Sequence, residues 1–169
     1  MWIGKERPQS KSYCFDKDPH FQYFNEYTKR DEFKEDAKTG FTKTMSLQGS
    51  CFMLTRDRYL ELDICDEKLG NWGNQGIEVA VKSWLSGGEV LVNHNTWYAH
   101  MFRTQGGDFS FPYQLGGREV QKTKKRVKDL FWKNRWAKQE KPLSWLVRKF
   151  APVKGWSEKD IKKLEEQEK

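Results

Sequence analysis

Residues 72–78, which read WGNQGIE, place a carboxylate beside two glycines at the start of a predicted helix. Gly73 and Gly76 let the backbone turn sharply, or approach a ligand, where a Cβ would clash. Glu78 falls in the first turn of the helix, where unpaired amide groups and the helix dipole favour a negative charge. Such a carboxylate can accept a proton, or a hydrogen bond from a sugar hydroxyl. Taken alone, these residues favour the simpler alternative that Glu78 only complements the dipole.

A second set of candidates lies about 25 residues further along the chain. His100 ends a predicted strand, where an imidazole is well placed to bind a metal or a phosphate. Arg103 adds a cation that can pair with a diphosphate. Without other information, His100 is better interpreted as a hydrogen-bonded core residue. Asp16 and Asp18 have the spacing of an acidic pair that holds a divalent ion, but the preceding residues do not predict the buried strand that such a pair normally follows.

The elements that must position these residues are clearest between residues 76 and 103. Apolar residues recur there at the spacing of one helix face, and Gly87 and Gly88 end the pattern. The residues of this face are Ile77, Ala80, Val81, Trp84 and Leu85. Residues 89–93 and 96–102 predict two strands, and residues 47–55 predict a buried strand ahead of a helix that begins near residue 56. This order of elements predicts an α/β fold.

The rest of the chain is divided by composition into a lead-in and a tail. Residues 1–48 predict an extended, aromatic-rich segment, 49–117 the central α/β core, and 118–169 a basic helical tail. Residues 104–117 are rich in glycine and predict a binding loop. Within the tail, residues 118–136 and a segment opening at Pro142 predict helices. Ser157 and Asp160 predict a capping box before a charged terminal helix.

Composition narrows the class of protein. A chain of 169 residues with 15% aromatic residues is long enough for one folded domain. The sequence contains no apolar run of membrane-spanning length, and its first residues do not predict a secretory signal. Its three cysteines lack metal-type spacing, which favours reduced thiols and a cytoplasmic location.

The net charge of +7 is concentrated in one block. Residues 118–141 contain ten Lys or Arg against three Asp or Glu. The difference, +7, equals the net charge of the whole chain. The block also contains Phe131, Trp132 and Trp136, and could bind nucleic acid, an anionic membrane or glycan surface, or a phosphorylated ligand. The charge pattern alone favours a solvated helix face.

Two stretches together resemble a known family. Residues 49–62, GSCFMLTRDRYLEL, and 70–103, GNWGNQGIEVAVKSWLSGGEVLVNHNTWYAHMFR, are similar to the second half of a GT-A glycosyltransferase domain. The resemblance is to bacterial and phage family 2 glycosyltransferases and to the polypeptide N-acetylgalactosaminyltransferases. In the latter a Trp-Gly-Gly-Glu-Asn-Leu-Glu segment opens a helix that ends in Gly-Gly, and a strand pair closes with Gly-His-Val-Phe-Arg. Residues 72–103 match that pattern without a gap.

The resemblance implies roles for individual residues. His100 is the position that would complete the coordination of a catalytic Mn²⁺ or Mg²⁺. Glu78 matches the second acid of the helix-opening motif, and Gln75 stands where the family has the first, so these two are the implied catalytic residues. The implied substrate-binding residues are Gly49 and Ser50 against the donor sugar, Trp72 and Gly73 in the motif, and Arg103 and Tyr113 in the loop that closes over the nucleotide.

The resemblance also implies a reaction and partners. We expect the C-terminal part of a GT-A fold, with a mixed sheet, flanking helices and a helical tail. A complete enzyme would move a sugar from a nucleotide-diphosphate donor to a hydroxyl of a glycan or other acceptor. The nucleotide-binding half is not recognised in these residues, so a separate N-terminal half and self-association are further expectations. The alternatives are a basic aromatic binding module, for which nucleic acid is the less expected partner, and an inactive remnant.

Overall fold

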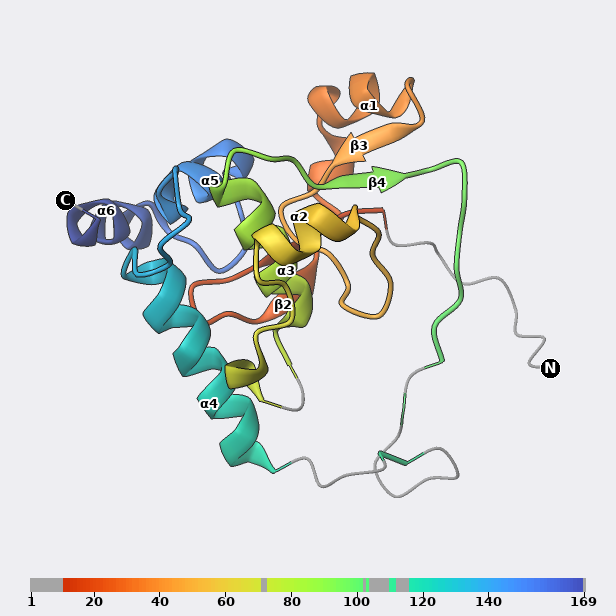
Figure 1. Cartoon of the computed structure of the whole chain (residues 1–169). Coiled ribbons are helices and arrows are strands. Elements are labelled where there is room, and N and C mark those ends of the chain that lie inside the picture. Colours follow the sequence, from red (N-terminus) through yellow and green to blue (C-terminus); the bar gives the residue numbers. More distant parts are fainter. Residues whose placement is uncertain (1–10, 71–72, 102, 104–109, 112–115, 169) are drawn as a thin grey trace.

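The computed structural model describes residues 11–70, 73–101, 103, 110–111 and 116–168 (Figure 1). The strands are short: β1 (Tyr13–Phe15), β2 (Phe21–Tyr23), β3 (Phe41–Lys43) and β4 (Leu91–Asn93). The α-helices are α1 (Asp31–Ala37), α2 (Arg56–Glu61), α3 (Gln75–Leu85), α4 (Gly117–Val127), α5 (Leu143–Phe150) and α6 (Glu158–Gln167). Single turns of other helix types are η1 (Tyr27–Lys29), η2 (Glu67–Leu69) and η3 (Lys128–Trp132). The predicted α/β class is confirmed, with small sheets and many helices.

Helix α3 forms where the periodicity predicts it. All five residues of the predicted apolar face are at most 1% exposed. The helix ends as expected, because Gly87 adopts a left-handed conformation with φ of 81° that glycine takes without steric cost. In Figure 1 α3 lies at the centre of the molecule, so its first turn is held between several other segments.

The sheets differ from the predicted mixed sheet. In the described residues β1 pairs with β2 and β3 pairs with β4, both antiparallel, as two separate sheets. Strand β4 confirms the strand predicted at 89–93, although it covers only Leu91–Asn93. Its partner β3 lies inside the segment that the sequence predicted to be an extended lead-in. The pairing therefore joins residues about 50 positions apart, which no local pattern indicates.

Two predicted strands are wrong. Residues 47–55 form a turn and an irregular segment, and residues 96–101 have no strand conformation. Both segments have apolar residues, but neither pairs with a strand of the two sheets in the described residues. Met53 is 98% exposed and Trp97 is 77% exposed. A strand needs a hydrogen-bonded partner, and an apolar run alone does not supply one.

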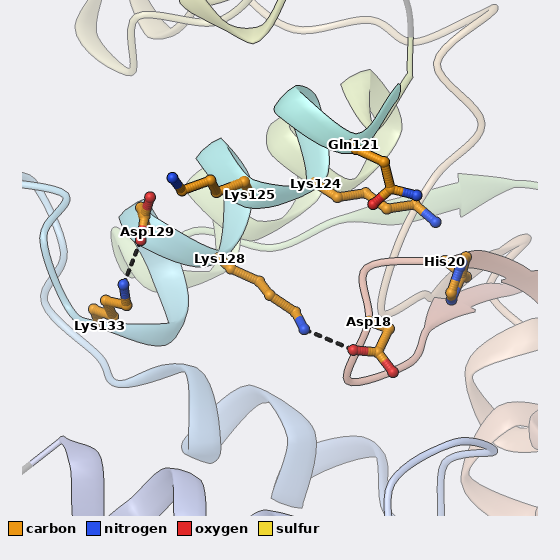
Figure 2. A pocket seen from close by; sticks show the side chains of 8 residues that line it. All are labelled: Asp18, His20, Gln121, Lys124, Lys125, Lys128, Asp129 and Lys133. Carbon is orange, nitrogen blue, oxygen red and sulfur yellow. Dashed lines mark hydrogen bonds and ion pairs between the residues drawn. The ribbon is translucent and has the colours of Figure 1, made fainter. Parts of the chain in front are cut away.

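The helices after residue 116 follow the sequence prediction closely. Helix α4 continues into η3, a π-helical turn, so helical structure ends at Trp132 rather than Trp136. One face of this continuous helix carries lysines that border a pocket beside the β1–β2 turn (Figure 2). Helix α5 follows Pro142 as predicted, and the capping box of Ser157 and Asp160 opens α6.

One hydrophobic core joins segments from the whole described chain. It includes Cys14 and Phe15 of β1, the inner face of α3, and side chains of α5 and α6. Two of its tryptophans also form hydrogen bonds with the backbone. The Trp84 indole donates to the carbonyl of Thr44 at 3.0 Å, and the Trp156 indole donates to the carbonyl of Phe15 at 2.9 Å. Ring-rich packing of this kind explains how a chain with modest aliphatic content forms a core. None of the described helices combines the length and apolar character needed to cross a membrane.

Candidate functional site

The start of α3 packs directly on the segment that contains Gly49 and Ser50. A Cβ on Gly76 would lie 1.9 Å from the carbonyl oxygen of Leu47, so only glycine fits there. A Cβ on Gly49 would lie 3.1 Å from the Gly76 nitrogen and 3.2 Å from the Gln75 side-chain oxygen. The two glycines thus allow a close approach between two stretches of backbone. Three residues predicted to be in the site, Gly49, Ser50 and Gln75, lie together as a result.

Tyr98 connects this junction to the segment that carries His100. The hydroxyls of Tyr98 and Ser50 lie 2.9 Å apart, and the Tyr98 hydroxyl donates to the side-chain oxygen of Gln48 at 3.2 Å. His100 lies two residues beyond Tyr98 and is exposed. Tyr98 therefore anchors the exposed 96–101 segment, which includes His100, beside the start of α3.

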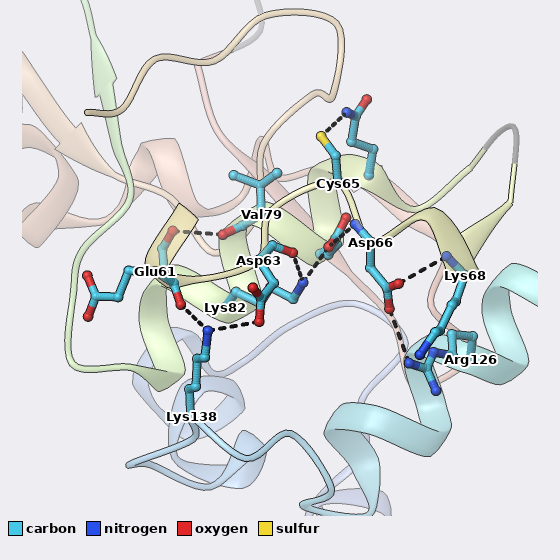
Figure 3. A network of polar contacts seen from close by, with 12 residues as sticks. Glu61, Asp63, Cys65, Asp66, Lys68, Val79, Lys82, Arg126 and Lys138 are labelled. Atoms are coloured by element: carbon cyan, nitrogen blue, oxygen red, sulfur yellow. Dashed lines mark hydrogen bonds and ion pairs between the residues drawn. The ribbon is translucent and has the colours of Figure 1, made fainter. Parts of the chain in front are cut away.

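Glu78 lies one turn deeper in α3 and is buried, at 1% exposure. Its Oε1 accepts hydrogen bonds from the Lys82 ammonium at 2.6 Å and from the backbone N–H of Asp66 at 3.0 Å. The Lys82 side chain, 2% exposed, also donates to the carbonyl of Asp63. The alternative that Glu78 only complements the helix dipole is incomplete, because the structure shows a buried ion pair that holds residues 63–66 against α3 (Figure 3).

Residues 63–66 also form ion pairs with residues later in the chain. The Arg126 guanidinium of α4 pairs with the Asp66 carboxylate at 3.2 Å, and Lys138 pairs with Asp63 at 2.8 Å (Figure 3). Partial burial acts to raise the pKa of Asp66, but the N–H of Lys68 and the Arg126 guanidinium outweigh it and lower that pKa. A hydrogen bond from Lys138 lowers the pKa of Asp63. Residues 61–66 thus form a polar joint between α3 and the basic part of the chain.

The other residues predicted for the site are more scattered. Gly73 has a φ of 101° and lies near Thr123 of α4, so it serves a backbone turn that other residues adopt only with strain. The Arg103 guanidinium donates to the carbonyl of Ser110 at 2.6 Å, which fastens the base of the predicted loop. Trp72 and Tyr113 lie outside the described residues.

The described residues do not complete a metal site. No three His, Cys, Asp or Glu side chains are grouped there in a way that could hold a metal ion. Divalent cations such as Mg²⁺ and Mn²⁺ take several oxygen or nitrogen ligands, so His100 does not make a site without additional donors. Asp16, one of the two acids of the candidate metal-binding pair, closes the β1–β2 turn instead. Its carboxylate accepts hydrogen bonds from the N–H groups of Asp18 and His20 at 2.8 and 3.0 Å.

The aromatic residues of the basic block belong to the core. Phe131, Trp132 and Trp136 are between 0 and 9% exposed. Trp132 stacks on Trp156 with ring centroids 5.9 Å apart. These rings do not form an exposed surface on which bases could stack.

Sequence reasoning missed two residues of the α3 junction. Tyr98 was counted only as part of a strand, and Cys65 received no role. The Gln75 amide donates to the Cys65 sulfur at 3.0 Å, which orients the amide beside Gly49. The only available signal for Tyr98 was an aromatic side chain two residues before His100, which by itself does not indicate a hydrogen bond 48 residues away.

With this geometry in place, comparison with known proteins relates the chain to glycosyltransferases. It is 27% identical over 106 residues, 62% of its length, to N-acetylgalactosaminyltransferase 7 of Rattus norvegicus. It is 27% identical over 97 residues to the Homo sapiens protein of that name. It is 29% identical over 100 residues to putative polypeptide N-acetylgalactosaminyltransferase 13 of Drosophila melanogaster. The predicted resemblance to polypeptide N-acetylgalactosaminyltransferases is confirmed over about 60% of the chain.

These matches cover only a small part of each relative. The chain spans about one sixth of their length, between 15 and 17% for the three proteins named. No protein-family model matches the chain, and no solved structure matches it.

Proposed function

We propose that this chain is the C-terminal, acceptor-side part of a GT-A glycosyltransferase. The complete enzyme would transfer a sugar from a nucleotide-diphosphate donor to a hydroxyl group of a glycan or another acceptor. The single observation that carries the proposal is the junction at the start of α3. There Gly49, Ser50, Gln75 and, through Tyr98, the His100 segment lie together in a chain whose relatives are glycosyltransferases.

The junction offers groups suited to a sugar ring. Ser50 and Tyr98 supply hydroxyls, and Gln75 supplies an amide, all able to donate or accept hydrogen bonds. Neutral donors and acceptors of this kind match the hydroxyl groups of a sugar, and the close packing of Gly49 on Gly76 brings them together. Trp72 would add an apolar face for the ring, and Arg103 and Tyr113 would contact the nucleotide from the loop.

The catalytic role predicted for Glu78 needs a different form in this structure. Its carboxylate is buried and engaged by Lys82 and by the Asp66 backbone, so it does not reach an acceptor hydroxyl in this conformation. We propose that Glu78 positions the first turn of α3, and that Gln75 is the member of the motif that meets substrate. The carboxylate that would act as a base would then come from outside the described residues.

Metal dependence remains part of the proposal. A bound Mn²⁺ or Mg²⁺ would neutralise charge on a departing diphosphate. Its other ligands would have to come from residues beyond those described, and a separate N-terminal half of the enzyme is one possible source.

The competing proposals are weaker. A nucleic-acid module would need exposed aromatic residues in the basic block, and its rings are buried. An inactive remnant would retain the fold but bind no donor, which the same experiment tests.

The test is a calorimetric titration of the full chain with UDP-N-acetylgalactosamine, with and without MnCl₂, for the wild type and two histidine variants. We expect His100→Ala to weaken binding about tenfold, the loss expected for one hydrogen bond to a charged group. His94→Ala is the control, because His94 directly follows β4 and its Nε2 lies 2.7 Å from the Thr42 hydroxyl of β3. Absence of binding by the wild type, or an equal loss in both variants, would contradict the proposal.

A further inference from the structure

We propose that the pocket between helix α4 and the β1–β2 turn is a second anion site, which binds a phosphate-bearing ligand. The pocket is a hollow of about 510 Å³. Lys124, Lys125, Lys128 and Lys133 border it on the helix side, and Asp18 and His20 border it on the turn side. It lies apart from the residues of the α3 junction, none of which lines it.

The lysines face the pocket because the opposite side of α4 is fixed. Thr123 is 1% exposed and donates to the carbonyl of Leu69 at 2.5 Å, and Val127 is fully buried. Lys124 and Lys125 lie three and four residues after Gln121, and Lys128 lies four and three residues after those two lysines. The three lysines therefore share the outer face of α4. Figure 2 shows Lys124 and Lys128 extending toward the β1–β2 turn and Lys125 extending toward Asp129. A ligand in the hollow would meet ammonium groups from more than one direction.

The acidic residues in the pocket leave part of this charge unpaired. Lys128 pairs with Asp18 at 2.6 Å, and Lys133 pairs with Asp129. Within the described chain, neither Lys124 nor Lys125 has a carboxylate within ion-pair distance. Four lysines against two aspartates leave a net charge of +2 around one hollow. The Asp18–Lys128 pair is exposed, at 54 and 39% of the two side chains, so an incoming anion can replace Asp18 as the partner of Lys128.

The chemistry of the pocket favours a phosphate group over a long polyanion. Ammonium groups are compact charges that surround the several oxygens of a phosphate without a fixed geometry. A single-stranded nucleic acid would need exposed rings on which its bases stack, whereas the neighbouring rings Phe131, Trp132 and Trp136 are buried. The phosphate could belong to a soluble sugar phosphate or to the headgroup of a lipid.

The experiment measures binding of inorganic diphosphate to the full chain by calorimetry at low salt. Lys124→Gln/Lys125→Gln should weaken binding about tenfold or more, because two of the four ammonium groups are lost. Lys162→Gln/Lys163→Gln on α6 is the matched control, since it removes the same charge from another exposed surface and should change affinity little. Asp18→Asn should strengthen binding about threefold, because it removes the competing carboxylate.

Two further arms, with vesicles and with an oligonucleotide, separate the ligand sources. Vesicles containing phosphatidylglycerol that bind through the same two lysines, together with diphosphate, would assign the phosphate to a lipid headgroup. Diphosphate binding without vesicle binding would assign it to a soluble ligand, and either result supports the site. Three results would overturn the proposed site. These are binding of an oligonucleotide without binding of diphosphate, an equal loss of affinity in the α6 control, and no diphosphate binding at all. Because Lys124 and Lys125 lie outside the α3 junction, this site can fail while the proposed transfer function stands, and the reverse also holds.

Discussion

Two acid–lysine pairs share a spacing of four residues, one in α3 and one at η3, the turn that continues α4, and the two pairs have opposite environments. In α3, Glu78 and Lys82 are 1 and 2% exposed, whereas in the turn that continues α4, Asp129 and Lys133 are 30 and 52% exposed. The sequence spacing is the same, but burial gives the pairs different consequences. A buried pair whose partner is removed leaves an uncompensated charge in the core, and an exposed pair is replaced by water.

The difference bears on the two sites proposed above. The charges of α3 are committed to structure, since they hold residues 63–66 and leave the neutral groups of Gln75 and Ser50 for a ligand. The charges of α4 are open to solvent and can change partner. The α3 junction is therefore suited to a sugar, and the α4 pocket is suited to a phosphate.

The largest expected effect comes from breaking the buried pair. Lys82→Met should lower the free energy of unfolding by about 3–5 kcal/mol, because Glu78 would stay buried without its cation. Lys133→Met, the same substitution in the exposed pair, should leave it nearly unchanged. Urea denaturation of both variants measures the two effects, and restoring stability with Glu78→Gln in the Lys82→Met background would confirm the cause. Similar stabilities for the two single variants would show that burial does not separate the pairs.

A smaller effect should come from the first helical turns, each of which contains a glycine. Gly76→Ala should destabilise the fold by about 1–3 kcal/mol, since the new methyl group would overlap the carbonyl of Leu47. Gly117→Ala in α4 meets no atom within 4 Å and should be neutral or stabilising by up to about 1 kcal/mol. Thermal unfolding of the two variants compares them directly. Loss of stability in Gly117→Ala and none in Gly76→Ala would reverse the assignment of the packed junction.

The sequence predicted the helices better than the strands. Helices α3, α5 and α6 are encoded locally by apolar spacing, by Pro142 and by the Ser157 capping box, so their patterns were sufficient. The strand predicted at 47–55 had the apolar residues but not the neighbour that a sheet requires. Pairing of β3 with β4 depends on contacts about 50 residues apart, which one sequence does not reveal.

The candidate site was predictable in part for the same reason. The motif that starts at Trp72 indicated Gln75 and Glu78, and resemblance added Gly49, Ser50 and His100. The burial of Glu78 had an available signal in Lys82 at helical spacing, but the sequence did not show that both side chains face the core. Tyr98 and Cys65 act through contacts across the fold, so they emerged only from the structure.

The most direct measurement of the central claim is the backbone amide spectrum of the Lys124→Gln/Lys125→Gln variant, titrated with UDP-N-acetylgalactosamine. This background removes the second anion site, so changes report on the donor alone. The account predicts the largest shifts at Gly49, Ser50, Gln75 and His100. Saturating donor that leaves those four amides unshifted, or that shifts only residues far from the start of α3, would contradict it.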